Sequence, residues 1–279
     1  HFLVGDNPEG SGQATDINAL GHVAGTTFFL RDDSETPGEF RFRNRAFVYD
    51  GTALTELGVL LGNTMSRAEG INRGGDVVGS SYGGPGEQHA FLHRDGELVD
   101  LGWGRALAVN DHREVVGGTV VVDVTKAFVY SNGELQVLGT LGGETSIAVD
   151  LNARGEIVGN SQTASGVTRA FLYRKGAMAE LPVPSETSTA AAINRVGEIV
   201  GAASSGATPT VSEGYLYRNG QVSLLRDLVP DDGCWNRLEA RDINDHGDIV
   251  GIGVMNSYAS CGEPGRYLVV ITRRPGRYR

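Results

Sequence analysis

One stretch of sequence decides the fold: Ala148-Val149-Asp150-Leu151-Asn152-Ala153-Arg154-Gly155-Glu156-Ile157-Val158-Gly159. It follows the scheme Ala-x-Asp-Ile-Asn-x-x-Gly-x-Val-Val-Gly, and the chain of 279 residues carries six copies of it. The copies run over residues 14–25, 68–79, 106–117, 148–159, 190–201 and 240–251. Their asparagines, at 18, 72, 110, 152, 194 and 244, are therefore 54, 38, 42, 42 and 50 residues apart. Periods of about 40–50 residues are typical of β-propeller blades or of helical arrays.

The chemistry of the repeat favours strands over helices. Its apolar positions are mostly valine and isoleucine, which favour strands, and no segment keeps a 3.6-residue period. The Asn-x-x-Gly step predicts a hairpin turn, because the asparagine side chain caps the turn and the glycine adopts a positive φ. The third copy has Arg113 in place of this glycine, which predicts a strained or differently shaped turn.

A second pattern completes each repeat. Ala-Phe-x-Tyr follows the first pattern and leads through a glycine into a Leu-x-x-Leu-Gly strand. It occurs at Ala46-Phe47, Ala90-Phe91, Ala127-Phe128 and Ala170-Phe171, with weaker forms at Gly214-Tyr215 and Arg266-Tyr267. Each repeat thus contains four short strands, which is one blade. We therefore expect an all-β chain, folded over residues 1–279 as a single six-bladed β-propeller with four-stranded antiparallel blades.

The sixth repeat lacks a closing strand, and the first residues of the chain resemble one. Gly5 precedes Ala14 by nine residues, just as Gly139 precedes Ala148 by nine. We therefore expect residues 1–5 to supply the fourth strand of blade six, which would close the ring and leave few exposed sheet edges.

Composition excludes several classes of function. The net charge of −10 argues against nucleic acid as a partner. No apolar run approaches the roughly 20 residues of a membrane span, and the basic residues Arg273, Arg274, Arg277 and Arg279 are expected to form a solvated end. The six histidines show no metal-ligand spacing, so we expect no metal and no cofactor. The expected state is a monomer that binds a small-molecule ligand or substrate.

Positions that are alike in every copy are expected to build the scaffold. The six asparagines cap turns, and Asp16, Asp150 and Asp242 are expected to tie neighbouring blades through backbone hydrogen bonds. Function is then expected at positions that differ, in loops and at strand ends on a rigid frame.

Two positions at the start of strand one vary between the copies and are expected to line the mouth of the central channel. The first holds Gln13, Arg67, Arg105, Ile147, Thr189 and Glu239, and the second holds Thr15, Glu69, Leu107, Val149, Ala191 and Arg241. The mouth is thus charged at blades two, three and six and apolar at blades four and five. An apolar wall with a few polar groups is typical of small-molecule sites.

These positions supply the candidate site residues. The candidate catalytic residues are Arg67, Glu69, Arg105, Glu239 and Arg241. The candidate ligand-binding residues are Gln13, Thr15, Leu107, Ile147 and Val149, together with the aromatic residues Trp103, Tyr82, Trp235 and Tyr258. The alternative is that Arg67–Glu69 and Glu239–Arg241 are ordinary surface ion pairs. Cys234 and Cys261 fall in two loops of blade six, where a disulfide would favour an oxidising compartment.

Several of these motifs resemble the HAF-repeat family, which is described as extracellular repeats. The motifs are His89-Ala90-Phe91, Leu138-Gly139-Thr140-Leu141-Gly142-Gly143 and the asparagine repeat itself. The resemblance spans nearly the whole chain and implies an extracellular location, but it implies little about activity. Some bacterial propellers that form rings in polyketide antibiotic pathways are also similar in appearance, although no motif here carries that likeness. Such a role would imply a cytoplasmic location.

Three functions follow from these observations. The first is a funnel that binds a small, largely apolar molecule and, as a cofactor-independent cyclase, closes a ring in it by positioning. The second is a secreted binding module without catalysis, as the HAF resemblance implies. The third, a metal-dependent lyase or hydrolase, fits least well because no metal-ligand spacing is found.

Overall fold

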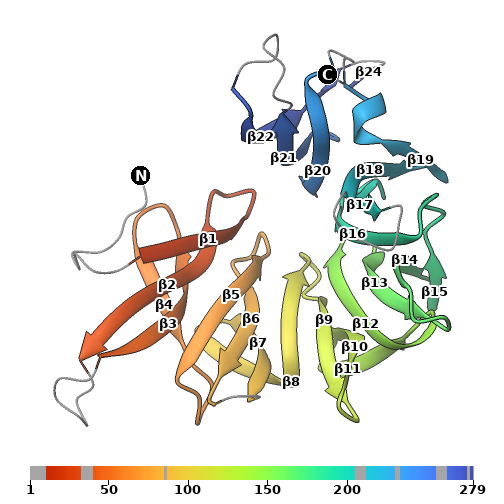
Figure 1. The fold of residues 1–279 in the computed structure, drawn as a ribbon. Coiled ribbons are helices and arrows are strands. Elements are labelled where there is room, and N and C mark those ends of the chain that lie inside the picture. Colours follow the sequence, from red (N-terminus) through yellow and green to blue (C-terminus); the bar gives the residue numbers. More distant parts are fainter. Residues whose placement is uncertain are drawn as a thin grey trace. The chain divides into compact units, whose positions relative to one another are not determined.

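The computed structural model describes residues 11–32, 40–84, 87–204, 212–229, 233–255, 263–274 and 277–278. These residues form antiparallel strands and one short 3-10 helix (Figure 1). The chain divides into two compact units, His1–Val137 and Leu138–Arg279. The expectation of an all-β, antiparallel chain is confirmed. No helix among the described residues is long and apolar enough to cross a membrane.

The first unit contains a four-stranded sheet and most of a seven-stranded sheet. The first sheet is formed by β1 (Ser11–Ile17), β2 (Val23–Asp32), β3 (Phe40–Tyr49) and β4 (Leu54–Gly58). The second is formed by β5 (Met65–Ile71), β6 (Val77–Tyr82), β7 (Gln88–Arg94), β8 (Glu97–Val109), β9 (Val115–Val121), β10 (Val124–Ser131) and β11 (Glu134–Gly139). The long strand β8 pairs with β7 through its first half and with β9 through its second half. The seven strands are therefore two four-stranded repeats that share β8.

The second unit contains two four-stranded sheets, one three-stranded sheet and a short hairpin. The strands in the order of the chain are β12 (Gly142–Leu151), β13 (Ile157–Thr163), β14 (Thr168–Arg174), β15 (Ala177–Glu180), β16 (Thr187–Ile193), β17 (Ile199–Ser204), β18 (Ser212–Arg218), β19 (Gln221–Leu224), β20 (Trp235–Ile243), β21 (Ile249–Met255), β22 (Gly265–Ile271), β23 (Arg273–Arg274) and β24 (Arg277–Tyr278). The 3-10 helix η1 (Leu225–Asp227) follows β19. β20, β21 and β22 form the three-stranded sheet, in which β22 has no described fourth strand beside it.

The hydrophobic core consists of clusters between successive sheets. One cluster joins Ala46 and Leu57 of the first sheet to Ala68 and Phe91 of the next repeat. In the second unit, Leu181 and Tyr215 belong to a cluster that joins two successive sheets in the same way. The aromatic residue of the Ala-Phe motif is almost fully buried in each of the first five repeats. Burial of such a side chain contributes about 1.5–3 kcal/mol, so the repeated Ala-Phe motif is a packing element.

Every copy of the repeat contains a β-bulge directly after its alanine. The register shifts between Ala14 and Asp16 in the first copy, and at the equivalent place in the other five. The last glycine of the repeat makes the bulge possible: a Cβ built on Gly79 would overlap the carbonyl oxygen of Arg67. The bulge and this glycine therefore form one structural motif, which occurs in all six copies.

The Asn-x-x-Gly turns have the expected form. Asn152 Oδ1 accepts hydrogen bonds from the backbone nitrogens of Arg154 (2.9 Å) and Glu156 (3.1 Å). Arg113 keeps the shape of the turn, with φ of 64° against 69° at Gly155, and its nitrogen bonds to the carbonyl oxygen of Asn110 over 3.0 Å. The turn is thus strained rather than reshaped. The guanidinium of Arg113 also pairs with Asp76 at 3.2 Å.

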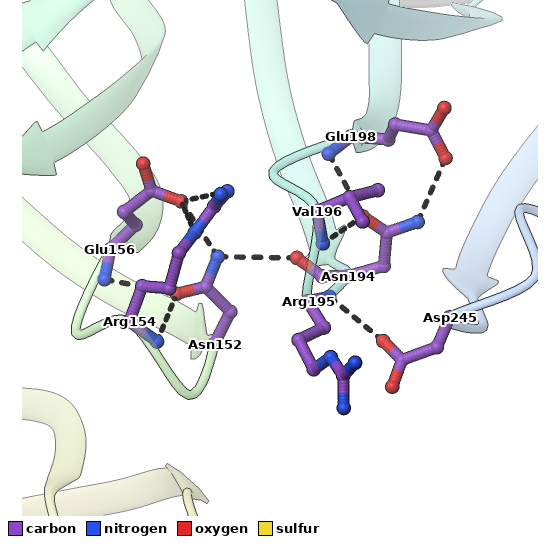
Figure 2. Close-up of polar contacts among 8 residues, drawn as sticks. All are labelled: Asn152, Arg154, Glu156, Asn194, Arg195, Val196, Glu198 and Asp245. Carbon is purple, nitrogen blue, oxygen red and sulfur yellow. Dashed lines mark hydrogen bonds and ion pairs between the residues drawn. The ribbon is translucent and has the colours of Figure 1, made fainter.

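The same asparagines link successive repeats. Asn152 Nδ2 donates to the carbonyl oxygen of Asn194 over 3.2 Å, as Figure 2 shows, and Asn72 does the same to Asn110 over 3.1 Å. A second link beside it joins the backbone nitrogen of Arg195 to Asp245 Oδ1 over 2.8 Å (Figure 2). The asparagines were expected only to cap turns, so these links between repeats are an additional role.

The aspartates two residues before the asparagine also tie repeats together, as expected. Asp16 Oδ2 accepts from the backbone nitrogen of Ile71, and Asp150 Oδ2 accepts from that of Ile193, each over 2.8 Å. Asp242 accepts from the nitrogen of the residue that follows it, Ile243, over 2.7 Å. The expectation is therefore confirmed for Asp16 and Asp150.

Two details of the second unit differ from the sequence-based picture. Arg273 is exposed, as expected of a solvated end, but it is also held in place: its backbone nitrogen donates to Asp248 Oδ1 (2.9 Å) and its Nη1 to Glu198 Oε1 (3.2 Å). The weak motif Arg266-Tyr267 is out of register, because Gly251 pairs with Val269, which therefore occupies the place of the phenylalanine. Residues 1–5, which were expected to close blade six, lie outside the described residues.

Candidate binding site

The residue that differs most between copies is the extra residue of the β-bulge. The register shift in each copy skips one residue, and the six skipped residues are Thr15, Glu69, Leu107, Val149, Ala191 and Arg241. A bulge turns the extra residue out of the normal alternation of a strand and is common beside functional sites. The strand that carries it lies at the edge of its sheet in five of the six copies, the exception being β8. Identical scaffold residues thus present an unlike side chain in each copy.

In the first unit the bulge presents Glu69 between arginines. Glu69 Oε1 lies 3.1 Å from Arg67 Nε. Burial raises the pKa of the Glu69 carboxyl, and the charges of Arg67 and Arg105 oppose this rise. The structure therefore brings together three of the residues expected to be catalytic.

The guanidiniums of this cluster have unused hydrogen-bonding capacity. Arg67 Nε is buried and has no hydrogen-bond partner, since its contact with Glu69 has ion-pair distance but not hydrogen-bond geometry. Arg105 is exposed, and its side chain makes no ion pair or hydrogen bond with any described residue. An acceptor that enters here would find donors already in place.

The remaining predicted residues of the first unit differ in exposure and in hydrogen bonding. Thr15 Oγ1 lies 3.0 Å from the carbonyl oxygen of Ala68 and 3.2 Å from that of Ala24, so it links two repeats. Gln13 is exposed on β1, and Leu107 is half-buried on β8, as Thr15 is on β1. The hydroxyl of Thr15 is thus already engaged, and Gln13 is the most exposed of the three.

In the second unit a carboxylate again lies between two arginines. Glu239 Oε1 is 3.0 Å from Arg237 and Glu239 Oε2 is 3.0 Å from Arg241. Sequence reasoning paired Glu239 with Arg241 but missed Arg237, which is two residues earlier on the same strand. Arg237 Nε is also buried without a hydrogen-bond partner. The alternation of side chains along a strand is the signal that could have indicated Arg237.

The apolar candidates of the second unit lie beside the core. Val149 is half-buried and packs against the cluster that contains Val158 and Ile193. Ile147 is half-buried, and its carbonyl oxygen occupies the place that a Cβ on Gly159 would need. Both side chains are thus partly accessible.

The aromatic candidates lie in different surroundings. Trp103 is 50% exposed in the middle of β8, and its ring is tilted by 50° against that of His89 at a centroid distance of 4.6 Å. Nδ1 of His89 is 2.9 Å from Asp100. The hydroxyl of Tyr82 lies 2.8 Å from Ser80 Oγ and 3.2 Å from Gln88 Nε2.

Trp235, the first residue of β20, packs on its own three-stranded sheet. Its ring covers Gly253 and meets Tyr267 edge-on at 6.4 Å. Tyr258 lies outside the described residues. Cys234 is disulfide-bonded. Cys261 lies outside the described residues, so the pairing of these two cysteines stays a prediction.

The residue before the Ala-Phe motif has a structural role that sequence reasoning missed. Arg169 Nη2 donates to the carbonyl oxygen of Val183 over 2.8 Å, and its Nη1 donates to the carbonyl oxygens of Ser185 and Glu186. Arg45 Nη1 donates to the carbonyl oxygen of Thr64 over 2.6 Å. These residues fasten the connection to the next sheet. The basic residue that recurs before Ala-Phe was the available signal.

Buried serines were also missed. Ser66 Oγ accepts from the nitrogen of Ala46 (3.0 Å), and Ser188 Oγ accepts from that of Ala170 (3.1 Å). Each serine lies two residues before the alanine of its repeat, so Ser-x-Ala was the signal. In the parts of the chain that the structure describes, no three histidine, cysteine, aspartate or glutamate side chains gather as a metal site would require.

The fold has counterparts among solved structures. TolB from Acinetobacter baumannii is 13% identical with a TM-score of 0.53, over 91% of this chain and 65% of TolB. The β-propeller domain of the Trilobed protease from Pyrococcus furiosus is 11% identical with a TM-score of 0.54, over 93% of this chain and 92% of that domain. The acylaminoacyl peptidase from Pyrococcus horikoshii is 12% identical with a TM-score of 0.55, over 94% of this chain and 46% of the peptidase.

These likenesses show the class of protein: the chain has a β-propeller fold. It spans just under two thirds of TolB and less than half of the peptidase. No family model matches the sequence, and no curated protein matches it. At identities of 11–13% the likeness concerns the fold alone.

Proposed function

We propose that the six repeats are the six blades of one propeller, and that residues 1–5 pair with β22. The first five repeats each have a fourth strand beside the Ala-Phe strand, whereas β22 has none among the described residues. Leu268 and Val270 on β22 are 77% and 59% exposed. The equivalents of Leu268 in the first four repeats are buried alanines, and those of Val270 include the buried Leu92, Leu172 and Leu216. The segment Phe2-Leu3-Val4-Gly5 has the composition and the spacing of the missing strand.

Hydrogen exchange tests this closure. We expect the amides of β22 to be protected in the intact chain and to exchange at least tenfold faster after deletion of residues 1–5. The amides of β14, an interior strand of its own sheet, serve as the control. Equal exchange of β22 with and without residues 1–5 would overturn the closure.

We further propose that the bulged residues and their neighbours bind a small, largely apolar molecule. The observation that carries this proposal is the six-fold bulge, which presents a different side chain from an identical frame in each copy. Leu107, Ile147 and Val149 supply apolar surface, and Arg67, Glu69, Arg105, Glu239 and Arg241 supply polar groups. In a six-bladed ring these residues would surround the mouth of the channel, which is a common place for a ligand.

Titration with the neutral apolar fluorophore N-phenylnaphthylamine tests the proposal. We expect saturable fluorescence enhancement, and an affinity about tenfold lower in the Leu107→Asp and Val149→Asp variants, because a carboxylate disfavours an apolar ligand. Leu20→Asp and Val196→Asp are matched controls on exposed turns and should bind like the wild type. Unchanged affinity in the two site variants would contradict this location.

Ring closure of the bound molecule is the enzymatic extension of this proposal. An isomerisation that joins two ends of one chain consumes and releases no other atoms, and holding the ends together lowers its barrier by several kcal/mol. Arg105 would stabilise developing negative charge. A synthetic chain that carries a diene and an alkene should cyclise faster with the protein than without it, and more slowly with Arg105→Gln. Equal rates with and without the protein would contradict a cyclase.

A secreted binding module is the second candidate, and the bonded state of Cys234 favours it. Disulfides persist mainly in oxidising compartments. A non-reducing peptide map of protein isolated from its own cells should show Cys234 and Cys261 linked if the protein is exported. Two free thiols would argue for the intracellular alternative.

A further inference from the structure

We propose that the ligand of this site carries an anionic group, in the simplest case one carboxylate on an otherwise apolar body. This inference rests on the proposed binding of a small apolar molecule and specifies the chemical nature of the polar group on that molecule. It is argued for each compact unit by itself.

In the cluster of Arg67, Glu69 and Arg105, two positive charges accompany one negative charge. Arg67 and Arg105 face the single carboxylate of Glu69, whose Oε1 is 3.1 Å from Arg67. Arg105 is exposed and has no described partner for its charge. A guanidinium has five N–H donors and matches a carboxylate with two parallel bonds, so Arg105 is suited to receive an anion.

The cluster of Arg237, Glu239 and Arg241 in the second unit has the same local excess, but its geometry differs. Glu239 uses one oxygen for Arg237 and the other for Arg241, each at 3.0 Å. Its carboxylate is therefore fully occupied, while both guanidiniums keep donors. The side chain of Arg241 is 62% exposed, so its free donors are accessible.

One arginine nitrogen in each cluster lacks a hydrogen bond. Arg67 Nε and Arg237 Nε are buried and have no hydrogen-bond partner. Buried donors without a partner are rare in native proteins, and an incoming acceptor satisfies them. Each cluster thus combines one buried, unsatisfied donor with one exposed guanidinium.

The excess is local, because the whole chain has a net charge of −10. An anion is therefore repelled at long range and held only where guanidiniums outnumber carboxylates. This arrangement selects for a ligand whose apolar body supplies most of the affinity and whose charge sets its orientation.

A matched pair of probes tests the inference: dansyl-labelled undecanoic acid and its methyl ester. We expect the acid to bind about tenfold more tightly than the ester. Arg105→Gln and Arg241→Gln should each be compared with the wild type, and at least one should lose most of this preference while keeping its affinity for the ester. Arg73→Gln and Arg195→Gln are the matched controls, since both arginines are exposed on turns at the other end of the repeat, and they should keep the preference.

The outcomes separate this inference from the proposed function. Loss of the preference in one variant supports the inference and assigns the anion to that unit. If acid and ester bind equally tightly, the proposed anion-binding group is excluded, but the proposed binding of an apolar molecule is still supported. If neither probe binds, the proposed function itself is contradicted.

Discussion

Asn194 Nδ2 donates a hydrogen bond to the carbonyl oxygen of Asn244, 3.1 Å away, and so joins two repeats whose asparagines are 50 residues apart. Its Oδ1 meanwhile accepts from the nitrogens of Val196 and Glu198 within its own turn, and its Nδ2 also reaches Glu198 Oε2 at 2.8 Å (Figure 2). One buried side chain therefore shapes a turn and connects two sheets. The capping role alone would have left the amide nitrogen unexplained.

Replacement of this asparagine should be costly. Asn194→Ala removes the hydrogen bond to Glu198 Oε2 and leaves two turn nitrogens without their acceptor, which we expect to lower the free energy of unfolding by about 2–3 kcal/mol. Urea denaturation followed by circular dichroism measures the loss. Arg195→Ala should cost under about 0.5 kcal/mol, because the link of Arg195 to Asp245 uses its backbone nitrogen. Similar losses in both variants would refute the special role of the asparagine.

The repeat glycine should tolerate no side chain. In Gly79→Ala the new Cβ would overlap the carbonyl oxygen of Arg67, so the bulge must shift, at a cost of about 1–3 kcal/mol. The affinity for N-phenylnaphthylamine should fall as well, because Glu69 moves with the bulge. Gly12→Ala is the control, since its nearest heavy atom, the carbonyl oxygen of Thr26, would be 3.7 Å from the new Cβ. A stable Gly79→Ala variant with unchanged binding would show that the bulge is not needed.

Arg113 offers a test of backbone strain. It adopts a φ of 64°, which glycine accepts and alanine resists. We expect Arg113→Ala to be about 1 kcal/mol less stable than Arg113→Gly, because both lose the ion pair with Asp76 and only the alanine keeps the strain. Urea midpoints of the two variants measure the difference. Equal stability would mean that the turn rearranges when the arginine is removed.

The pKa of Glu69 predicts how stability depends on pH. Burial raises the pKa of Glu69 in the folded protein above its value in the unfolded chain. The folded state therefore binds the proton more tightly, so this group stabilises most below its unfolded pKa and loses that contribution as pH rises through its folded pKa. Glu69→Gln should thus become more favourable relative to the wild type between about pH 4 and pH 7. Denaturant titrations at the two pH values measure the change, and a trend in the opposite direction would mean that the arginines outweigh burial.

The local parts of the structure could be predicted from the sequence. The Asn-x-x-Gly turns, the strands that flank them and the burial of the Ala-Phe aromatic residues all follow from turn chemistry, β-branched residues and repetition. The out-of-register motif at Arg266-Tyr267 shows the limit, because the pairing of Gly251 with Val269 depends on hydrogen bonds between strands and not on composition. The hydrogen bond between Arg273 and Glu198, which lies 75 positions earlier in the chain, could likewise not be predicted from the sequence.

For the candidate site, the sequence identified the positions but not their geometry. Comparison of the six copies identified Glu69, Arg105 and Arg241, because they occupy equivalent positions of the repeat at which the residue type varies. It did not indicate the bulge that presents Glu69 and Arg241, nor Arg237 as the second arginine on Glu239.

The sequence by itself determined the strands, the turns and the number of repeats, because each depends on residues within about a dozen positions of one another. Only the tertiary structure decided which atoms meet across repeats, such as Asn72 with the carbonyl of Asn110 and Asp150 with the nitrogen of Ile193. The physical reason is that a hydrogen bond requires donor and acceptor to lie within about 3 Å. For residues some 40 positions apart, that distance is set by the packing of whole sheets.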